Sequence, residues 1–309
     1  MSAPRRPRKF DDRGDQATEG GSRVSEMTMV VSGFRTIEGP VVTDDGDLYF
    51  SDVRGGGVYR LSGDGSIEVA IAKRKGVGGL CLHCDGGIVA SGRDVCHVKD
   101  GVSRVLYSRE DVAPRPGVQV GGFNDIGADP EGRIFAGVQR MTPDGDYGSG
   151  TLVMVSGEHA GDVVFEGLLP NGNSVSPDRE LLYQVDSTGQ RVLIFDLRPK
   201  VPAFLREFST SALPGVPDGA AFDENGSLWI AFHHGGCVAQ FDPSGRLQTR
   251  IEIPTPTVTS LCFGSRSSHE LFVVTDDESD SSDPIGWPVA EYCSPHDVAG
   301  RHKSPNPTV

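Results

Sequence analysis

The sequence predicts an all-β protein, a six-bladed β-propeller that spans about residues 27–278. A hairpin signal, in which an apolar strand, an Asp-Gly-type turn and a second strand follow one another, recurs along the chain. The turn residues of six such units stand at 46, 86, 132, 178, 226 and 269, so successive units are 40, 46, 46, 48 and 43 residues apart. Repeats of this length with several short strands are typical of propeller blades. No stretch of helical length carries an apolar stripe of the helical period.

The strands of each unit follow the turns in order. Second strands are expected from Leu48, Ile88, Ile134, Leu181, Leu228 and Leu271. Third strands are expected at Gly56–Leu61, Val95–Val98, Gly150–Val155, Arg191–Phe195 and Gly236–Phe241. The sixth unit has few residues left for an outer strand, and we expect Thr28–Val31 to supply it and close the ring. Two β-sandwiches are the competing architecture, but they would not require this regular spacing.

Composition narrows the class of protein. The net charge of −14 and the pI near 5.0 argue against a nucleic-acid partner, since no basic stripe is available. No run of about 18 apolar residues that could cross a bilayer is present. The N-terminus lacks the apolar core of a secretory signal, so we expect a cytoplasmic protein and leave the oligomeric state open. Residues 1–26 are polar and are expected to be a flexible tail, and residues 279–309 are expected to be poorly ordered.

The six cysteines, at positions 81, 84, 96, 237, 262 and 293, are expected to remain thiols in a chain of this size. Cys81, Cys84, Cys96 and His97 suggest a structural zinc site. Cys81 lies within an apolar strand pattern, whereas Cys84 lies in the following turn, so their side chains need not converge. Small buried apolar residues are the favoured interpretation, and zinc is the alternative.

Four polar side chains occupy corresponding positions in the innermost strands of different units: Glu38, Asn124, Asn171 and Asp218. Because these strands surround one axis, the side chains should converge at the mouth of the central channel. The second strands run antiparallel and end at the same face, which should place further residues around the rim: Asp52, Arg93, Arg140, Asp186, His233 and His234. Carboxylate and amide oxygens favour one divalent cation, with Ca²⁺ preferred and Zn²⁺, Mg²⁺ or Mn²⁺ as alternatives.

Several motifs resemble the senescence marker protein/gluconolactonase/luciferin-regenerating enzyme-like family. They are Glu38-Gly39-Pro40, Phe123-Asn124-Asp125, Pro170-Asn171-Gly172 and Val216-Pro217-Asp218-Gly219, in this order between about Thr28 and Asp277. The resemblance implies a six-bladed propeller that hydrolyses small lactones or, in some members, organophosphate esters. It also implies that Glu38, Asn171 and Asp218 bind the metal, that Asn124 contacts metal-bound water or substrate, and that Asp218 acts as the general base.

Two positions depart from this family pattern. Sugar-lactone members usually carry Arg two residues before the Asn, where this chain has Gly122, and Asn173 replaces a usual apolar residue. We expect Gly122 to leave space for bulkier, less polar substrates than gluconolactone. Arg93, Arg140, His233 and His234 are candidate substrate contacts, and the two histidines are also alternative bases.

The predicted function is therefore a metal-dependent lactonase or related esterase that acts on a small molecule. No Gly-x-Ser-x-Gly elbow is present, so a serine nucleophile is not expected. A metal-dependent phosphotriesterase, a strictosidine-synthase-like propeller and a non-enzymatic ligand- or protein-binding propeller are the alternatives. The last of these would not need polar side chains that converge in the channel.

Overall fold

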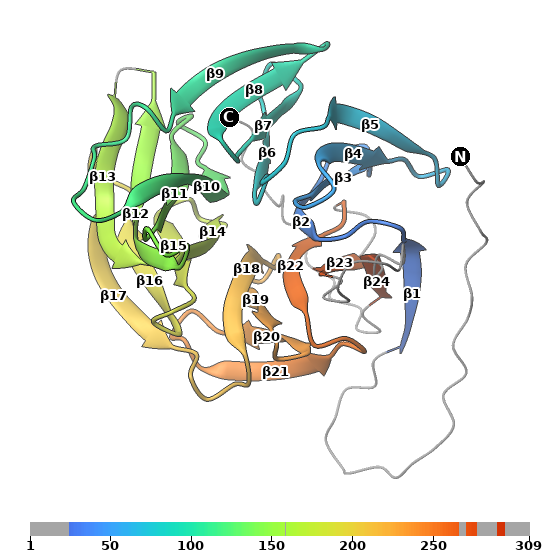
Figure 1. The fold of residues 1–309 in the computed structure, drawn as a ribbon. Coiled ribbons are helices and arrows are strands. Elements are labelled where there is room, and N and C mark those ends of the chain that lie inside the picture. Colours follow the sequence, from blue (N-terminus) through green and yellow to red (C-terminus); the bar gives the residue numbers. More distant parts are fainter. Residues whose placement is uncertain (1–24, 158, 266–269, 277–288, 294–309) are drawn as a thin grey trace.

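The strands are arranged radially around a central channel (Figure 1). The computed structural model describes residues 25–157, 159–265, 270–276 and 289–293. These residues form β-strands and connecting turns and contain no helix, and hence none that could cross a membrane. The prediction of an all-β propeller is confirmed.

Five sheets each consist of four consecutive strands, ordered from the channel outward. The first two are β2 (Ile37–Val42), β3 (Leu48–Asp52), β4 (Gly57–Leu61), β5 (Ile67–Ala72), and β6 (Leu80–Leu82), β7 (Ile88–Ala90), β8 (Asp94–Lys99), β9 (Val102–Ser108). The third is β10 (Gln119–Ala128), β11 (Ile134–Met141), β12 (Tyr147–Ser156), β13 (His159–Leu168). The fourth and fifth are β14 (Pro170–Val175), β15 (Leu181–Asp186), β16 (Arg191–Asp196), β17 (Ala203–Ser209), and β18 (Val216–Phe222), β19 (Leu228–His233), β20 (Cys237–Phe241), β21 (Leu247–Glu252).

A further four-stranded sheet combines the two ends of the chain. It contains β22 (Val258–Phe263), β23 (Glu270–Thr275), β24 (Val289–Cys293) and β1 (Ser25–Val31), in this order from the channel outward. The outermost position of β1 agrees with the expected role of Thr28–Val31. Among the described residues, this composite sheet stands beside the five sheets of consecutive strands.

The predicted terminal tails lie largely outside the described residues. Strand β24 is a difference from the prediction, because it falls within residues 279–309, which were expected to be poorly ordered. The short segment is paired on both sides, by β23 and by β1. Two partner strands supply the backbone hydrogen bonds that local composition does not reveal.

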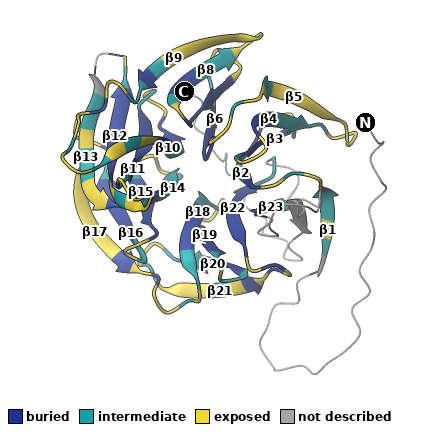
Figure 2. Cartoon of the chain, viewed as in Figure 1, coloured by how far each residue is buried: buried dark blue, intermediate teal, exposed yellow. Residues whose placement is uncertain are grey.

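Packing between neighbouring sheets supplies the core. Six clusters of buried apolar side chains each combine residues of two adjacent sheets, such as Tyr183 with Phe232 and Phe50 with Phe272. The outer strands β5, β9, β17 and β21 are largely exposed, whereas the inner strands are largely buried (Figure 2). Each inner strand contacts the inner strands on both sides, so the channel has a continuous wall.

The channel has two ends, which we name by their loops. At the turn face, each inner strand meets its tight turn, as where Gly46 N donates to Thr43 O at 3.0 Å. At the mouth face, the second strand of each sheet ends and the next inner strand begins. The alternating strand directions therefore place the turns after the inner strands at one end and the predicted rim residues at the other.

Candidate functional site

The inner strands break their regular pairing at the positions of the predicted site residues. Register shifts lie between Glu38 and Val41, Phe123 and Ile126, Asn171 and Asn173, and Pro217 and Ala220. A β-bulge adds a residue to one strand and re-aims the side chains beside it. Each bulge therefore changes the direction of the site side chains from the one that regular alternation along the strand would give them.

Glycines next to the site residues permit this close approach of strands. Gly39 has φ +55°, a conformation that favours glycine, and a Cβ there would lie 3.0 Å from Gly79 Cα. A Cβ at Gly172 would lie 2.5 Å from Asp218 O. The channel is therefore narrowed by backbone at the level where Glu38, Asn171 and Asp218 enter it.

The two site asparagines are held by hydrogen bonds that cross between sheets. Asn124 Nδ2 donates to Pro170 O at 3.0 Å and to Asn171 Oδ1. Asn171 Nδ2 donates to Ser187 Oγ at 2.7 Å, and Ser187 Oγ donates to Pro217 O at 2.6 Å. Ser187 therefore fixes which end of the Asn171 amide faces Asn124, in the way that outer groups orient metal ligands.

The carboxyl groups of the site share a low-dielectric environment. Burial, followed by the negative charges of Asp218 and Asp125, holds the pKa of the Glu38 carboxyl well above its usual range. Burial, followed by the charges of Asp125 and Asp276, does the same to the pKa of Asp218, whose side chain is 9% exposed. Among the described residues, no Lys or Arg forms an ion pair with Glu38 or Asp218. Glu38 and Asp218 are therefore buried acidic groups without a basic partner of their own among the described residues.

Two acidic residues that the sequence prediction did not assign also belong to this environment. Burial raises the pKa of Asp125 to about 7, although an N–H from Gly172 opposes the shift. Asp276, 4% exposed, accepts a hydrogen bond from Thr36 Oγ1 at 2.8 Å and an ion pair from Arg54 at 3.1 Å. Strand alternation would place Asp125 opposite Asn124, so only the bulge brings both to the site.

The two aspartates that were predicted at the rim, Asp52 and Asp186, accept hydrogen bonds from backbone N–H groups of nearby loops. Asp52 Oδ1 accepts the N–H of Gly55 at 2.7 Å, and Asp186 Oδ1 accepts the N–H of Leu169 at 3.0 Å. Both are buried, and Asp186 also pairs with Arg191 Nε at 2.9 Å. These carboxylates stabilise the entry of the inner strands.

The predicted basic contacts behave differently from one another. The Arg93 side chain is 71% exposed and lies 4.0 Å from Glu110. Arg140, in contrast, is 2% exposed and donates from Nη2 to Ala113 O at 2.9 Å. Burial lowers the pKa of Arg140, as does the neighbouring charge of Arg115. Arg140 is therefore covered by the loop before β10 and does not stand on the open rim.

The two histidines lie at the mouth-face end of β19. His234 is exposed with φ +58°, His233 is half-buried, and their rings are 4.2 Å apart in an edge-to-face arrangement. Backbone pairing of His233 with Thr257 fixes this corner against the next sheet. Both histidines therefore lie at the mouth face, and their contact with a substrate stays a prediction.

Gly122 does not provide the space that was expected of it. A Cβ at this position would lie 2.7 Å from Gly92 O, and the adjacent Phe123 exchanges backbone hydrogen bonds with Gly92 at 2.7 and 3.1 Å. The glycine allows two sheets to meet backbone to backbone, so an arginine there would clash. Asn173, the second departure, bonds Phe135 O and Gln184 Oε1, both at 3.1 Å, and links two sheets.

The cysteines do not form the suggested zinc set. Cys81 and Cys96 are buried, whereas Cys84 is exposed, and burial raises the pKa of Cys81 to about 12. His83, Cys84 and Asp85 do approach one another within 4.8 Å on the turn face. However, His83 Nδ1 already accepts the Asp85 N–H at 3.1 Å. The positive charges of Lys99 and Arg104, which act on His83, would also repel a metal ion at this position. The interpretation of Cys81 and Cys96 as small buried residues is confirmed.

The fold and the site thus define an all-β propeller with carboxylate and amide oxygens gathered on its axis. Residues 36–277 match the family model described as the SMP-30/Gluconolactonase/LRE-like region. The chain belongs to this family, as the sequence motifs predicted.

Named relatives include two lactonases. The chain is 31% identical over 255 residues to a 6-deoxy-6-sulfogluconolactonase from Pseudomonas putida, covering 79% of this chain and 84% of that protein. It is 31% identical over 246 residues to the pentonolactonase XacC of Haloferax volcanii, covering 77% and 80%. A solved gluconolactonase from Xanthomonas campestris superposes with a TM-score of 0.71 at 20% identity over 89% of this chain and 91% of that one, which supports the fold.

Proposed function

We propose that this protein is a metal-dependent hydrolase that opens a small lactone or a related ester. The observation that supports this proposal is that Glu38 and Asp218 are buried and close enough for their charges to interact, and that they and Asn171 stand beside matching bulges of three inner strands. Two relatives at 31% identity are named as lactonases, which supports a lactone as the substrate class.

The residues present fit a divalent cation. The raised pKa values of Glu38 and Asp218 reflect two carboxyl groups without a basic counter-charge, and a cation would supply that charge. Oxygen ligands of this kind suit Ca²⁺, and a solved relative from Agrobacterium tumefaciens is described as a calcium-binding regucalcin. Coordination by Asn171 Oδ1 would replace the hydrogen bond that this atom accepts from Asn124. When bound, such an ion polarises a carbonyl and acidifies a water.

The side chains around the site supply the remaining chemistry. In the proposed reaction, Asp218 takes a proton from the attacking water while the water oxygen bonds to the acyl carbon. It then returns the proton to the alkoxide oxygen as the ring C–O bond breaks. Hydrogen bonds to Pro170 O and Asn171 hold the Asn124 amide in place. The amide can therefore orient the substrate with little further loss of its own conformational entropy.

Add-back of single ions to stripped protein tests this proposal. The protein is freed of metal with a chelator and assayed on a panel of sugar and aliphatic lactones, with a phosphotriester for comparison. We expect lactone hydrolysis to return when one kind of divalent ion is added back. In the Asp218→Ala variant we expect no hydrolysis with any of these ions. Unchanged metal stoichiometry in the Glu38→Ala, Asp218→Ala double variant would show that the ion binds elsewhere.

A further inference from the structure

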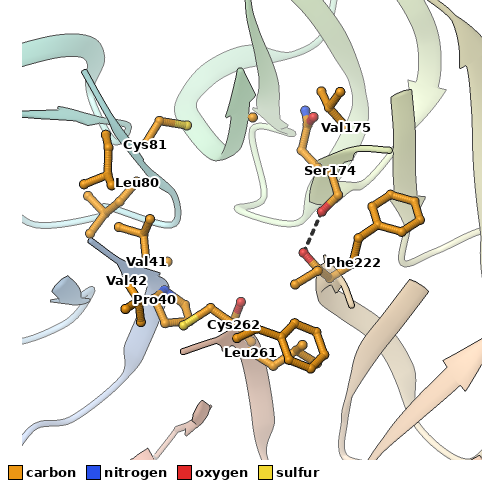
Figure 3. Close-up of a pocket in the computed structure, with 18 of the residues that line it drawn as sticks. Pro40, Val41, Val42, Leu80, Cys81, Ser174, Val175, Phe222, Leu261 and Cys262 are labelled. Atoms are coloured by element: carbon orange, nitrogen blue, oxygen red, sulfur yellow. Dashed lines mark hydrogen bonds between the residues drawn. The ribbon is translucent and has the colours of Figure 1, made fainter. Parts of the chain in front are cut away.

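A cavity of about 450 Å³ occupies the half of the channel that opens at the turn face. We call it the turn-face cavity, and its lining comes from the six inner strands and their turns. Figure 3 shows Val41, Leu80 and Cys81 on one side, across the open space from Ser174 and Val175. The cavity is thus a separate approach to the channel, opposite to the mouth.

The inner end of the turn-face cavity abuts the candidate metal ligands. Gly39 and Gly172 line it, and they directly follow Glu38 and Asn171 in the chain. Asp125 also lines it, and its charge acts on both Glu38 and Asp218. One carboxylate is therefore shared between the cavity and the site.

The described residues that line the cavity carry charge of one sign. They include the carboxylates Asp44, Asp125, Asp178, Asp223 and Glu224, and no Lys, Arg or His. Asp44 and Glu224 are exposed at the outer end, whereas Asp223 is occupied by Trp229 Nε1 at 2.9 Å. Carboxylates at both ends of the cavity, with walls of mixed apolar and polar side chains between them, give the cavity a negative field along its length.

The space is sufficient for a hydrated ion. Liquid water occupies about 30 Å³ per molecule, so a cavity of this size holds on the order of ten waters. The cavity can therefore hold a cation that keeps several of its waters, which lowers the desolvation cost of entering it.

In the mouth-face loops of the first two sheets, basic side chains stand beside carboxylates: Arg54 lies 3.1 Å from Asp276, and Arg93 lies 4.0 Å from Glu110. Arg54, Lys75 and Arg93 lie in the loops there, and the Arg54 and Arg93 side chains are 55% and 71% exposed. A Cβ at Gly56 would meet Lys75 Cγ at 3.0 Å, so Lys75 stands beside the loop that carries Arg54. Paired charges attract a cation less than the single-signed charge of the turn-face cavity does, which favours approach through the cavity.

We propose that the divalent cation enters and leaves the site through the turn-face cavity, with Asp125 as its last contact before Glu38 and Asp218. The mouth is then left for the substrate. This inference rests on the proposed metal site and concerns how that site is loaded.

Exchange kinetics of Ca²⁺ test the route. Stopped-flow mixing of loaded protein with a fluorescent chelator gives koff, titration gives Kd, and their ratio gives kon. Val175→Trp should narrow the cavity at a half-buried position that is not a ligand. We expect kon and koff both to fall about tenfold while Kd stays within about twofold, because a barrier on the path slows entry and exit equally.

Charge variants give a second test that does not depend on repacking. The pair Asp44→Asn with Glu224→Gln removes two exposed carboxylates at the cavity entrance. The matched pair Glu110→Gln with Asp144→Asn removes two exposed carboxylates from mouth-face loops. At low salt we expect the first pair to lower kon about threefold and the second to change it little, with the difference shrinking at high salt.

The outcomes separate the route from the site. Wild-type kon in the entrance pair, or a Val175→Trp protein that folds and exchanges Ca²⁺ at the wild-type rates, would overturn the route while leaving the site intact. A larger loss of kon in the mouth-face pair would place entry at the mouth. If metal-stripped wild type takes up neither Ca²⁺ nor Zn²⁺, the proposed metal site fails and the route fails with it.

Discussion

The mouth end and the turn end of the channel are built from the same six inner strands, yet their walls differ. At the level of the bulges, the wall carries the site residues, with Asn124 bonded to Asn171 and the charges of Glu38 and Asp218 acting on each other. Beyond the bulges, towards the turns, apolar side chains such as Val41, Leu80 and Leu261 alternate with polar ones such as Asn173, Ser174 and Ser260. A change of register by one residue exchanges the side chains that face the channel, so a bulge separates a polar level, which carries the site residues, from a level of mixed polarity on one strand.

The difference teaches how this fold keeps a charged site stable. The carboxyl groups are crowded where crossing hydrogen bonds hold the strands, as from Thr259 Oγ1 to Ile37 O at 2.6 Å and from Ser51 Oγ to Val77 O at 2.6 Å. The apolar packing between sheets is left undisturbed on either side. Function and stability therefore occupy different levels of the same strands.

The largest expected effect comes from a carboxylate at the polar level. Asp218→Asn keeps the size of the side chain but removes its charge and its capacity to take a proton. We expect kcat/KM for the best lactone to fall about 10³-fold, since losses of this order follow when one charge-stabilising group is removed. Asp100→Asn is the matched control on the turn face, at a φ of +50° that Asn tolerates, and should stay near wild type. An equal fall in kcat/KM in both variants would contradict the assignment of catalysis to the level of Asp218.

The second effect concerns the pH dependence of the metal-free protein. The pKa of Asp125 is raised from 3.8 to about 7, and those of Glu38 and Asp218 are raised as well. The folded state therefore binds more protons than the unfolded state over this range, and stability should fall as pH rises from about 4 to about 7. Urea unfolding at a series of pH values, with and without added metal, measures this slope.

The same pH series, measured with bound cation, is the control for the metal-free protein. Bound cation should flatten the slope, because it replaces protons as the positive partner of the carboxylates. Asp125→Asn should also flatten it in the metal-free protein. A metal-free wild type that gains stability across this range would contradict the shared acidic environment.

A smaller effect tests the backbone wall at the mouth. Gly122→Ala would place a Cβ 2.7 Å from Gly92 O, and we expect a loss of about 2 kcal/mol in the free energy of unfolding, as for an overpacked site. At Gly63 a Cβ would meet nothing within 4 Å, so Gly63→Ala should change stability little. A stable Gly122→Arg protein with increased sugar-lactone preference would instead show that the mouth is open there.

The smallest effect concerns closure of the ring. Thr259→Val removes the hydrogen bond from Oγ1 to Ile37 O while keeping the shape of the side chain. We expect a loss of about 1 kcal/mol in the free energy of unfolding, plus a contribution from the unpaired carbonyl. Thermal and urea unfolding measure this change, and a stability equal to wild type would mean that apolar packing alone joins the first and last inner strands.

Much of this molecule could be predicted from the sequence. The regular turn spacing indicated the propeller, because each turn is a local signal carried by Asp, Asn and Gly. The motifs around Glu38, Asn171 and Asp218 identified the family for the same reason, since each polar residue stands beside the glycine that its bulge requires. A cytoplasmic location remains a prediction, and so does the identity of the metal.

Tertiary structure decided which of the candidate residues share an environment. Asp125 and Asp276 belong to the acidic group, and Arg140 is covered instead of standing on the rim. Bulges and covering loops set the directions of these side chains, and strand alternation alone predicts those directions wrongly. Gly122 looked like free space in the chain and proved to be a contact between two backbones. Local sequence specifies turns and strands through short-range hydrogen bonds, whereas these outcomes depend on residues far apart in the chain that meet only when the ring closes.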